Sequence, residues 1–381
     1  MQSITEKVSS NSIIYFIFKT SLNLFFLFTR KLIKPLTENT GNVVIIALHK
    51  LGDTVFTIPA IRELQKKFQN SNITILCYPE VISIYKQGLT DVNFCDIEHK
   101  HFYFNGRCAN SKARKKLKAT RPEIIIDITG VMTSATLIFN SRANEIMGFN
   151  REHFKSIYTH YSPKKEIPHL SKMYLTAIQQ YISISDYITG NGFPIQSNPT
   201  GSILIQPFAG WKAKEWNFNK FMQLAVKLKD KFNVSLIVPV NIIPADVMVE
   251  AIDQKIEIIQ THSIQELIGN IKECSIFIGN DSGPLYIASL LGKPTFAIYG
   301  PTNPEYSLPL GHNHSYIRNE INCSPKKNEQ YCFTTGGKFG CPAFQCMNQL
   351  NLEQVYSELL PFVVKFCSIK ENNFENTERK S

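Results

Sequence analysis

The feature that most constrains this chain is a repeated alternation between short apolar runs of strand length and segments with helical periodicity. The apolar runs are Val43–Leu48, Ile73–Cys77 and Ile124–Ile128, followed later by Ile203–Gln206, Val234–Val238, Ile256–Ile259, Ser275–Ile278 and Thr295–Tyr299. Helix-like segments occupy 54–68, 218–232, 264–271 and 352–366. Continuous apolar strands that alternate with helices are typical of parallel sheets covered on both faces. We therefore predict an α/β protein with doubly wound sheets.

The length of 381 residues is enough for two such domains. A stretch rich in Pro and Gly between the two series of strands marks the expected connection. The expected organisation is a membrane-associating segment at 1–40, a Rossmann-like domain at 41–165, a connection at 166–200, a second Rossmann-like domain at 201–350, a helix at 351–368 and a disordered tail at 369–381. Ligands bind outside the carboxyl ends of parallel strands, so we expect the turns at 49–53 and 280–283 to face each other across a cleft.

The N-terminal segment 12–28 is strongly apolar but is interrupted by polar residues. The interruptions are Lys19, Thr20, Ser21 and Asn23, and the basic residues Arg30, Lys31 and Lys34 follow. The continuous apolar parts are shorter than the roughly 20 residues of a spanning helix. We expect a helix in the interface of an anionic membrane, with the body of the protein in the cytoplasm. A single spanning anchor and a helix packed on the protein itself are the alternatives.

The net charge of +10 suits phosphate-bearing ligands, an anionic membrane surface or nucleic acid. No nucleic-acid-binding signature is visible, so we expect no nucleic acid partner. The basic run Lys112–Lys118 is interpreted as a solvated helix face.

Nine cysteines are present, and four of them cluster near the C-terminus. The clustered residues are Cys323, Cys332, Cys341 and Cys346. Scattered cysteines in a chain of this length indicate a reducing compartment. The cluster contains no Cys-x-x-Cys pair, so reduced, partly buried thiols are favoured over a structural zinc site.

One turn combines several helix-starting signals. Asn280, Asp281 and Ser282 follow an apolar run, Pro284 suits a first helical turn, and Gly292 ends the apolar helix that follows. Such a turn presents backbone N–H groups and the positive end of a helix dipole, which suits a phosphate. A capped helix without any ligand is the alternative.

Four stretches occur together in an informative order. They are VVIIALHKLGDTVFTIPAIRELQKKF, PEIIIDITG followed by ANEIMGF, IQPFAGWKAKEWNFNKFMQLAVKL, and GNDSGPLYIASLLGKPTFAIYGPTNP. With these motifs the chain resembles glycosyltransferase family 9, the ADP-heptose:lipopolysaccharide heptosyltransferase family, from residue 42 to about residue 360.

The resemblance implies a GT-B fold and an inverting glycosyltransferase that needs neither a metal nor a cofactor. It implies transfer of heptose or a related sugar from a nucleotide-sugar donor, expected to be ADP-linked, to lipopolysaccharide core or another surface glycolipid. It also implies peripheral or single-anchor association with the cytoplasmic face of the inner membrane.

The resemblance also assigns roles to particular residues. Asp53 would be the general base, and Lys50 and Gly52 would contact the acceptor. The donor-binding residues would be Lys214, Asp281, Ser282, Gly283 and Thr302, with Asp281 on sugar hydroxyls and Thr302 in the nucleotide pocket. An N-cap role for Asp53, a surface position for Lys214 and a turn role for Thr302 are the structural alternatives.

The chain departs from the family pattern at three places. Tyr286 stands where the family often has His, Ala209-Gly210 where it often has hydroxyl residues, and Pro239-Val240-Asn241 where it tends to have a Gly-rich turn. A Rossmann oxidoreductase is disfavoured, because the turn at 49–53 contains one glycine and lacks Gly-x-Gly-x-x-Gly. A non-catalytic glycan- or nucleotide-binding relative and a nucleotide-sugar epimerase remain alternatives.

Overall fold

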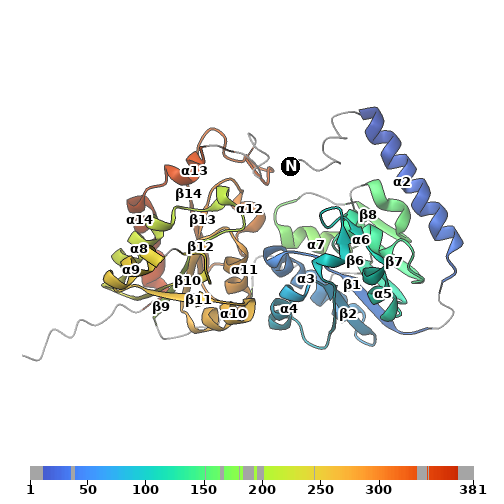
Figure 1. Ribbon diagram of the computed structural model, residues 1–381, viewed down its shortest axis with the longest axis horizontal. Helices are drawn as coiled ribbons and strands as arrows, with labels where there is room; N and C mark the ends of the chain where they lie inside the picture. Colours follow the sequence, from blue (N-terminus) through green and yellow to red (C-terminus); the bar gives the residue numbers. More distant parts are fainter. Residues whose placement is uncertain are drawn as a thin grey trace, which may run out of the picture. The chain divides into compact units, whose positions relative to one another are not determined.

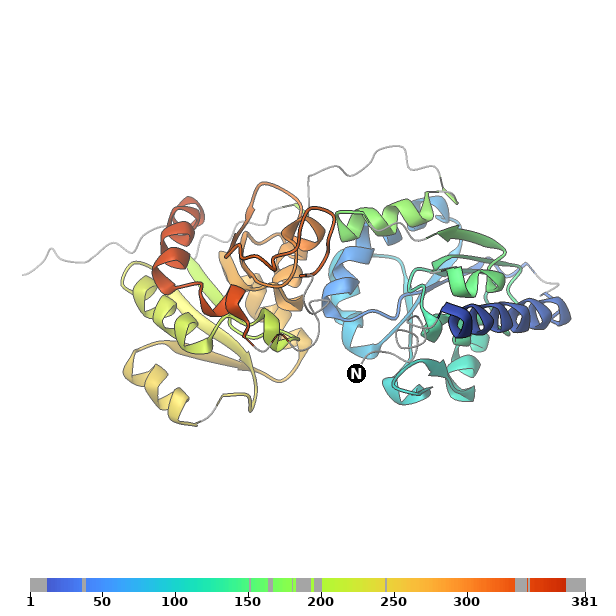
Figure 2. The same cartoon turned by 90° about the horizontal axis from the view of Figure 1, so that it is seen from above.

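The computed structural model describes residues 12–35, 39–150, 152–163, 167–179, 181–182, 193–194, 201–243, 245–332, 341 and 343–367. The chain divides into two compact units, residues 1–187 and 188–381 (Figures 1 and 2). Each unit contains a six-stranded parallel sheet, which confirms the predicted α/β class. The expected tail at 369–381 lies outside the described residues.

The first unit is built on the sheet β3-β2-β1-β6-β7-β8. Its strands are β1 (Asn42–Ile46), β2 (Asn72–Cys77), β3 (Asn93–Asp96), β6 (Ile124–Asp127), β7 (Glu145–Asn150) and β8 (His160–Pro163), and a small hairpin is formed by β4 (Phe102–Tyr103) and β5 (Cys108–Ala109). β1 pairs with β2 on one side and β6 on the other, with Val44 opposite Thr74 and Ile125. The strand order reverses between β1 and β6, where ligands bind in doubly wound sheets.

The helices of the first unit form two groups. They are α2 (Ser12–Leu32), α3 (Leu51–Lys67), α4 (Ile82–Gly88), α5 (Ser111–Ala119), α6 (Met132–Ile138) and α7 (Leu170–Ile178), with short 3-10 helices η1 (Pro79–Val81), η2 (His99–His101) and η3 (Glu152–Ile157). α3 packs against α4 and α7, whereas α5 packs against α6 and α2 against η3. α7 therefore belongs to the first unit, although its residues fall inside the expected connection 166–200.

The N-terminal helix α2 lies along one side of the first unit (Figure 1). None of the helices in the described part of the chain is long and apolar enough to cross a membrane. One side of α2 packs on the protein, through Phe26, whose side chain is 2% exposed.

The second unit repeats the same topology, with the sheet β11-β10-β9-β12-β13-β14. Its strands are β9 (Ser202–Gln206), β10 (Asn233–Pro239), β11 (Glu257–Thr261), β12 (Ile276–Asn280), β13 (Thr295–Tyr299) and β14 (His314–Arg318). Here the strand order reverses between β9 and β12, which pair directly, with Ile278 opposite Ile205. The turns that follow β9 and β12 therefore lie at the position where doubly wound sheets bind ligands.

The helices of the second unit enclose a continuous apolar core. They are α8 (Phe218–Lys229), α9 (Ala245–Asp253), α10 (Ile264–Glu273), α11 (Gly283–Leu290), α12 (Pro304–Ser307), α13 (Gln345–Asn348) and α14 (Leu352–Phe366), with the 3-10 turn η4 (Lys212–Lys214). α14 packs against α8 and β14 and contributes Val355, Leu359 and Val363 to this core. The C-terminal helix is thus an integral part of the second unit.

Candidate functional site

The turn after β12 is organised around a buried carboxylate. Asp281 is 1% exposed, and its Oδ2 atom lies 2.5 Å from Lys214 Nζ. The hydroxyls of Tyr286 and Thr302 donate hydrogen bonds to Oδ1 and Oδ2, and Ser307 Oγ lies 3.4 Å from Oδ1. Four protein groups from separate elements therefore surround this carboxylate, which points into the protein. The carboxylate thus holds Lys214 in place, and the expected contact of Asp281 with sugar hydroxyls stays a prediction.

The segment after β9 is held against the end of β12 by one amide side chain. Asn280 Nδ2 donates to Pro207 O at 2.7 Å, and Asn280 Oδ1 accepts from Trp216 N at 3.0 Å. Trp216 is fully buried and its indole N–H donates to Leu350 O at 2.9 Å. This explains the Lys-x-Trp spacing, because the buried tryptophan anchors the backbone that carries Lys214. The sequence predicts Asn280 as a helix-cap residue. Its polar side chain at the end of a buried strand is the feature that could have indicated these two hydrogen bonds to neighbouring backbone.

Lys214 itself is held in one place but remains within reach of solvent. Its side chain is 16% exposed, and Nζ lies 4.6 Å from the centroid of the Trp211 ring. By contrast Lys212 is 80% exposed and pairs with Glu215 at 2.7 Å. Of these two neighbouring lysines, Lys214 therefore has the orientation and partial burial that suit a binding site.

Ser282 and Gly283 begin helix α11. Ser282 is the N-cap residue but makes no side-chain cap hydrogen bond. The residue is 7% exposed, and its buried Oγ has no hydrogen-bond partner among the residues that the structure describes. The N–H of Gly283, at the first helical position, lies among those that have no acceptor within a helix. Ser282 therefore does not cap α11 through its side chain, and phosphate binding at this turn stays a prediction.

Thr302 is 4% exposed and donates to Asp281, so its side chain lies inside the second unit. It belongs to the hydrogen-bond network around Asp281, and its expected place in the nucleotide pocket stays a prediction. Tyr286, whose departure from the family pattern left it without an expected role, takes part in the same network. The nearby Tyr299 hydroxyl lies 3.2 Å from Ser307 Oγ, and burial raises the pKa of Tyr299, as does the charge of Asp281.

In the first unit, the three residues expected at the acceptor site lie at the start of α3. Lys50 is the N-cap residue and has no side-chain cap bond, while Gly52 and Asp53 lie in the first turn. The N-cap alternative for Asp53 is therefore wrong, because the cap position belongs to Lys50. The side chains of Lys50 and Asp53 are exposed. Asp53 is thus available to a ligand.

The turn before α3 is tied to the turn after β6. Thr129 Oγ1 accepts from Leu48 N at 2.8 Å and donates to Ile46 O at 3.1 Å. Asp127, which is fully buried, accepts from Thr129 N at 3.0 Å. These bonds explain the Asp-Ile-Thr-Gly motif, since it fixes the backbone that leads to Asp53.

Asp127 also accepts hydrogen bonds from the segment between η3 and β8 and from the turn after β6. Tyr158 Oη donates to Asp127 Oδ2 at 2.7 Å, and Gly130 N donates to Oδ1 at 3.0 Å. Burial raises the pKa of Asp127, whereas these hydrogen bonds act in the opposite direction. The ring of Tyr158 can approach only because position 148 is glycine, where a Cβ atom would lie 2.3 Å from the ring.

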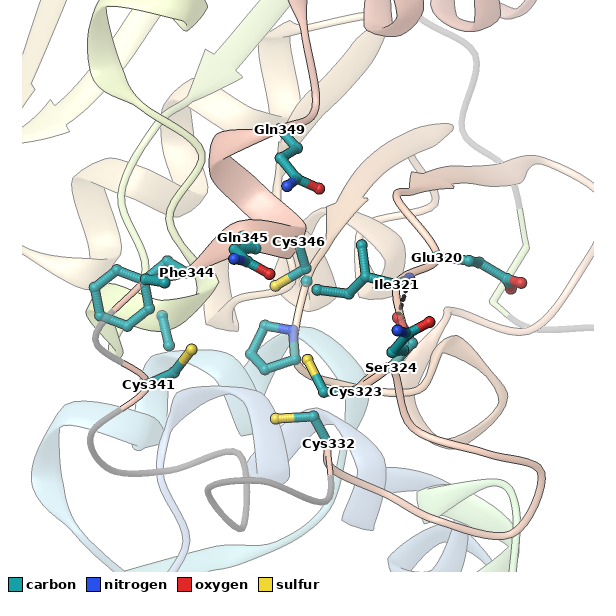
Figure 3. Close-up of a pocket in the computed structure, with 15 residues that line it drawn as sticks. Glu320, Ile321, Cys323, Ser324, Cys332, Cys341, Phe344, Gln345, Cys346 and Gln349 are labelled. Carbon is teal, nitrogen blue, oxygen red and sulfur yellow. Dashed lines mark hydrogen bonds between the residues drawn. The ribbon is translucent and has the colours of Figure 1, made fainter.

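A separate pocket of about 710 Å³ in the second unit is lined by the four clustered cysteines, with Gly300 and Pro301. Figure 3 shows the side chains of Cys323, Cys332, Cys341 and Cys346 pointing toward one another. All nine cysteines of the chain are unbridged. Burial raises the pKa of Cys346 to about 11, with a contribution from the other three thiols. Within the described part of the chain, no group of three or more His, Cys, Asp or Glu residues is arranged to hold a metal ion.

A family model described as glycosyltransferase family 9 (heptosyltransferase) matches residues 111–335. Lipooligosaccharide heptosyltransferase 2 of Campylobacter jejuni is 21% identical over 330 residues, which cover 81% of this chain and 94% of that protein. Lipooligosaccharide heptosyltransferase 2 of Haemophilus influenzae is 38% identical over 56 residues. That match spans only 15% of this chain and 16% of the relative's length.

Solved structures show the same fold. The Escherichia coli ADP-heptose lipopolysaccharide heptosyltransferase II aligns with a TM-score of 0.64 at 18% identity, covering 85% of this chain and 99% of that chain. The E. coli heptosyltransferase WaaC with ADP aligns with a TM-score of 0.63 at 16% identity, covering 84% and 99%. At these identities the similarity shows the fold, and it agrees with the expected GT-B class.

Proposed function

Since this chain belongs to glycosyltransferase family 9, we propose that it moves heptose or a related sugar, with inversion, from a nucleotide-sugar donor to lipopolysaccharide core or another surface glycolipid. We propose an ADP-linked donor, because the solved structures with this fold include one with ADP and one with an ADP-heptose analogue. The observation that carries the proposal is the ion pair between Lys214 and the buried carboxylate of Asp281, beside the start of α11.

The second unit is assigned the donor diphosphate. In an inverting transfer the bond between the sugar and the diphosphate breaks, and negative charge accumulates on the departing phosphate oxygens. Lys214 Nζ would stabilise that charge, together with the unused hydroxyl of Ser282 and the N–H of Gly283. Asp281 orients the lysine without presenting its own carboxylate to the phosphates, because that carboxylate is enclosed by protein donors.

The first unit is assigned the acceptor and the base. Asp53 would take the proton from the acceptor hydroxyl as its oxygen attacks the anomeric carbon on the face opposite the leaving group. Its carboxylate is exposed at the reversal point of a doubly wound sheet, where ligands bind. Lys50, also exposed, would meet an acidic group of the acceptor, and Gly52 would permit close approach. The proposed mechanism uses no metal or organic cofactor.

A glycolipid acceptor places the reaction at a membrane. We propose peripheral association with the cytoplasmic face of the inner membrane through α2, whose last turn carries Arg30 and Lys31. Basic residues beside an apolar helix favour an anionic leaflet.

The test is nucleotide release by the purified protein with a panel of ADP-, GDP- and UDP-sugars, with and without a lipopolysaccharide-core acceptor. We expect acceptor-dependent release from one donor, reduced about 100- to 10,000-fold by Asp53→Asn with nucleotide affinity unchanged. Asp91→Asn is the matched control, because Asp91 is an exposed aspartate of the same unit. Wild-type release that persists in Asp53→Asn would remove Asp53 from the mechanism.

The same panel separates the alternatives. A nucleotide-binding relative without activity would bind ADP tightly and release nothing with any acceptor. An epimerase would change the configuration of the donor's sugar in the absence of an acceptor. The mass of the donor would stay the same, and its NMR spectrum would change. Either outcome would contradict the proposed transfer.

A further inference from the structure

Helix α2 has two unlike sides. One side docks on the first unit, where the Phe26 ring lies 5.9 Å from Phe139 and 6.1 Å from Phe154. On the same side, Asn23 Oδ1 accepts from Ser156 Oγ at 3.1 Å. Figures 1 and 2 show the helix beside the first unit, with its other side turned away from that unit.

The outward side of α2 is apolar, which is the reverse of a solvated surface helix. Ile17, Leu24 and Phe28 are spaced by seven and four residues, so they share one face, and Phe28 is 66% exposed. The exposed large apolar side chains of this helix are Phe16, Ile17, Leu24, Phe25, Leu27, Phe28 and Leu32. Residues 12–35 contain no Asp or Glu. A contiguous apolar face of this kind marks an interaction site.

A cationic pocket of about 620 Å³ lies between α5 and α6. Its basic lining residues are Arg114, Lys115, Lys118, Arg121 and Arg142, and the residues that line it in the described structure include no Asp or Glu. Like charges in one concave site repel one another unless an anion neutralises them. The neighbouring Lys116 points elsewhere, since it pairs with Asp96 at 2.9 Å. Three basic residues of the run Lys112–Lys118 therefore line a pocket, whereas a solvated helix face was expected for the whole run.

The pocket and α2 are directly connected. Arg30 of α2 donates to Ser141 O at 2.5 Å and to Ala143 O at 3.4 Å, and both of these residues line the pocket. From the pocket side, Arg142 Nε donates to Lys34 O at 3.1 Å, just beyond the helix. The cationic pocket thus directly adjoins the C-terminal end of α2.

We propose that α2 and the pocket dock together on an anionic lipid bilayer, with the outward face of α2 among the acyl chains and the cationic pocket around a headgroup phosphate. The inference deepens the proposed membrane location by assigning a specific phosphate site. Charge complementarity favours a bilayer over a second copy of the chain, because two such copies would bring their cationic pockets together. An interfacial helix buries its apolar face by about 5–10 Å, which leaves adjacent cations at phosphate depth.

The experiment measures partitioning of the full chain onto vesicles, without donor or acceptor. Phosphatidylcholine vesicles are compared with vesicles that also contain phosphatidic acid or phosphatidylglycerol, matched in zeta potential. We expect binding to both anionic vesicles and tighter binding to phosphatidic acid, whose phosphomonoester can enter the pocket.

Three variants locate the effect. The pocket variant Lys115→Gln/Lys118→Gln/Arg121→Gln should weaken partitioning about 100-fold and lose the preference for phosphatidic acid. The control Lys67→Gln/Lys86→Gln/Lys255→Gln removes the same charge from exposed positions outside the pocket, and should change partitioning less than about threefold. Leu24→Ser/Phe28→Ser should abolish binding to every vesicle. If circular dichroism shows that the pocket variant is unfolded, Lys118→Gln alone should weaken binding about fivefold.

Equal losses in the pocket and control variants would overturn the phosphate site. Dimers in sedimentation experiments that dissociate in Leu24→Ser/Phe28→Ser, without vesicle binding, would assign the face to a second copy instead. Transfer to a delipidated, soluble acceptor is measured in parallel and should be unaffected by the pocket variant. A chain that binds vesicles as described but transfers no sugar would refute the proposed transfer and leave the docking surface intact.

Discussion

Lys214 Nζ lies 2.5 Å from Asp281 Oδ2, and this pair joins two turns that are 67 residues apart in the sequence. The turns follow β9 and β12, the strands between which the order of the sheet reverses. Asp281 is 1% exposed and Lys214 16%, so the carboxylate is enclosed while the ammonium group remains accessible. Asp281 thus orients Lys214, and the lysine could bind an anion that does not contact the enclosed carboxylate.

The first prediction concerns this lysine. Lys214→Ala should raise the Kd for ADP about 10- to 100-fold, because a charged hydrogen bond to phosphate is worth roughly 1.5–3 kcal/mol. Isothermal titration calorimetry measures the change. Lys212→Ala is the control and should alter the Kd less than about threefold, because Lys212 is exposed and paired only with Glu215. Equal effects in the two variants would show that Lys214 has no special part in donor binding.

The second prediction concerns the network behind the lysine. Thr302→Val removes the hydroxyl that donates to Asp281 and keeps the shape of the side chain. It should lower the free energy of unfolding by about 1–2 kcal/mol, because a buried acceptor loses a donor. It should also weaken ADP binding, by less than about tenfold, since it acts through Asp281. Thr90→Val, at an exposed loop position, should change neither urea unfolding nor ADP titration.

The third prediction tests the packing that supports the start of α3. A Cβ atom at Gly148 would lie 2.3 Å from the ring of Tyr158, which donates to the buried Asp127. Gly148→Ala should therefore lower the free energy of unfolding by about 2–3 kcal/mol, measured by urea denaturation. Gly210→Ala, with nothing within 4 Å of the added atom, should have little effect. An unchanged free energy of unfolding in Gly148→Ala would mean that the Tyr158 ring can move aside without cost.

The fourth prediction is a pH dependence. Burial lowers the pKa of His314 from 6.5 to about 4, and Nδ1 lies 2.8 Å from Thr295 Oγ1. A histidine with a lowered folded pKa contributes stability that is complete above pH 6.5 and is lost as the pH falls toward 4. The free energy of unfolding should fall by up to about 3 kcal/mol over this range. His314→Gln should remove this component, and an unchanged pH profile in that variant would contradict it.

Much of the local structure could be predicted from the sequence. The strand Thr295–Tyr299 and the helix Leu352–Phe366 have the predicted bounds, because an apolar run and a capped amphipathic segment are local signals. The strands β3, β7, β8 and β14 were missed, because β7 contains Gly148 within its apolar run and the other three consist largely of polar residues.

The candidate site was only partly predictable. The motifs indicated Lys214 and Asp281 as donor residues, but as separate contacts to phosphate and sugar. Only the structure shows that they contact each other and that Tyr286 and Thr302 complete the network. The sequence also indicated an apolar N-terminal helix. Which of its faces is exposed depends on the packing of Phe26 against Phe139 and Phe154.

The sequence by itself determined the α/β class, the positions of the eight most apolar strands and of several helices, and the location of the two turns at the sheet edges. These follow from apolar periodicity and turn residues, which act between neighbours in the chain. The tertiary structure alone decided that Asp281 is enclosed, that Ser282 keeps its hydroxyl free among the described residues, and that α2 presents its apolar side. Burial and the choice of side-chain partners depend on groups distant in the sequence, and packing brings those groups together.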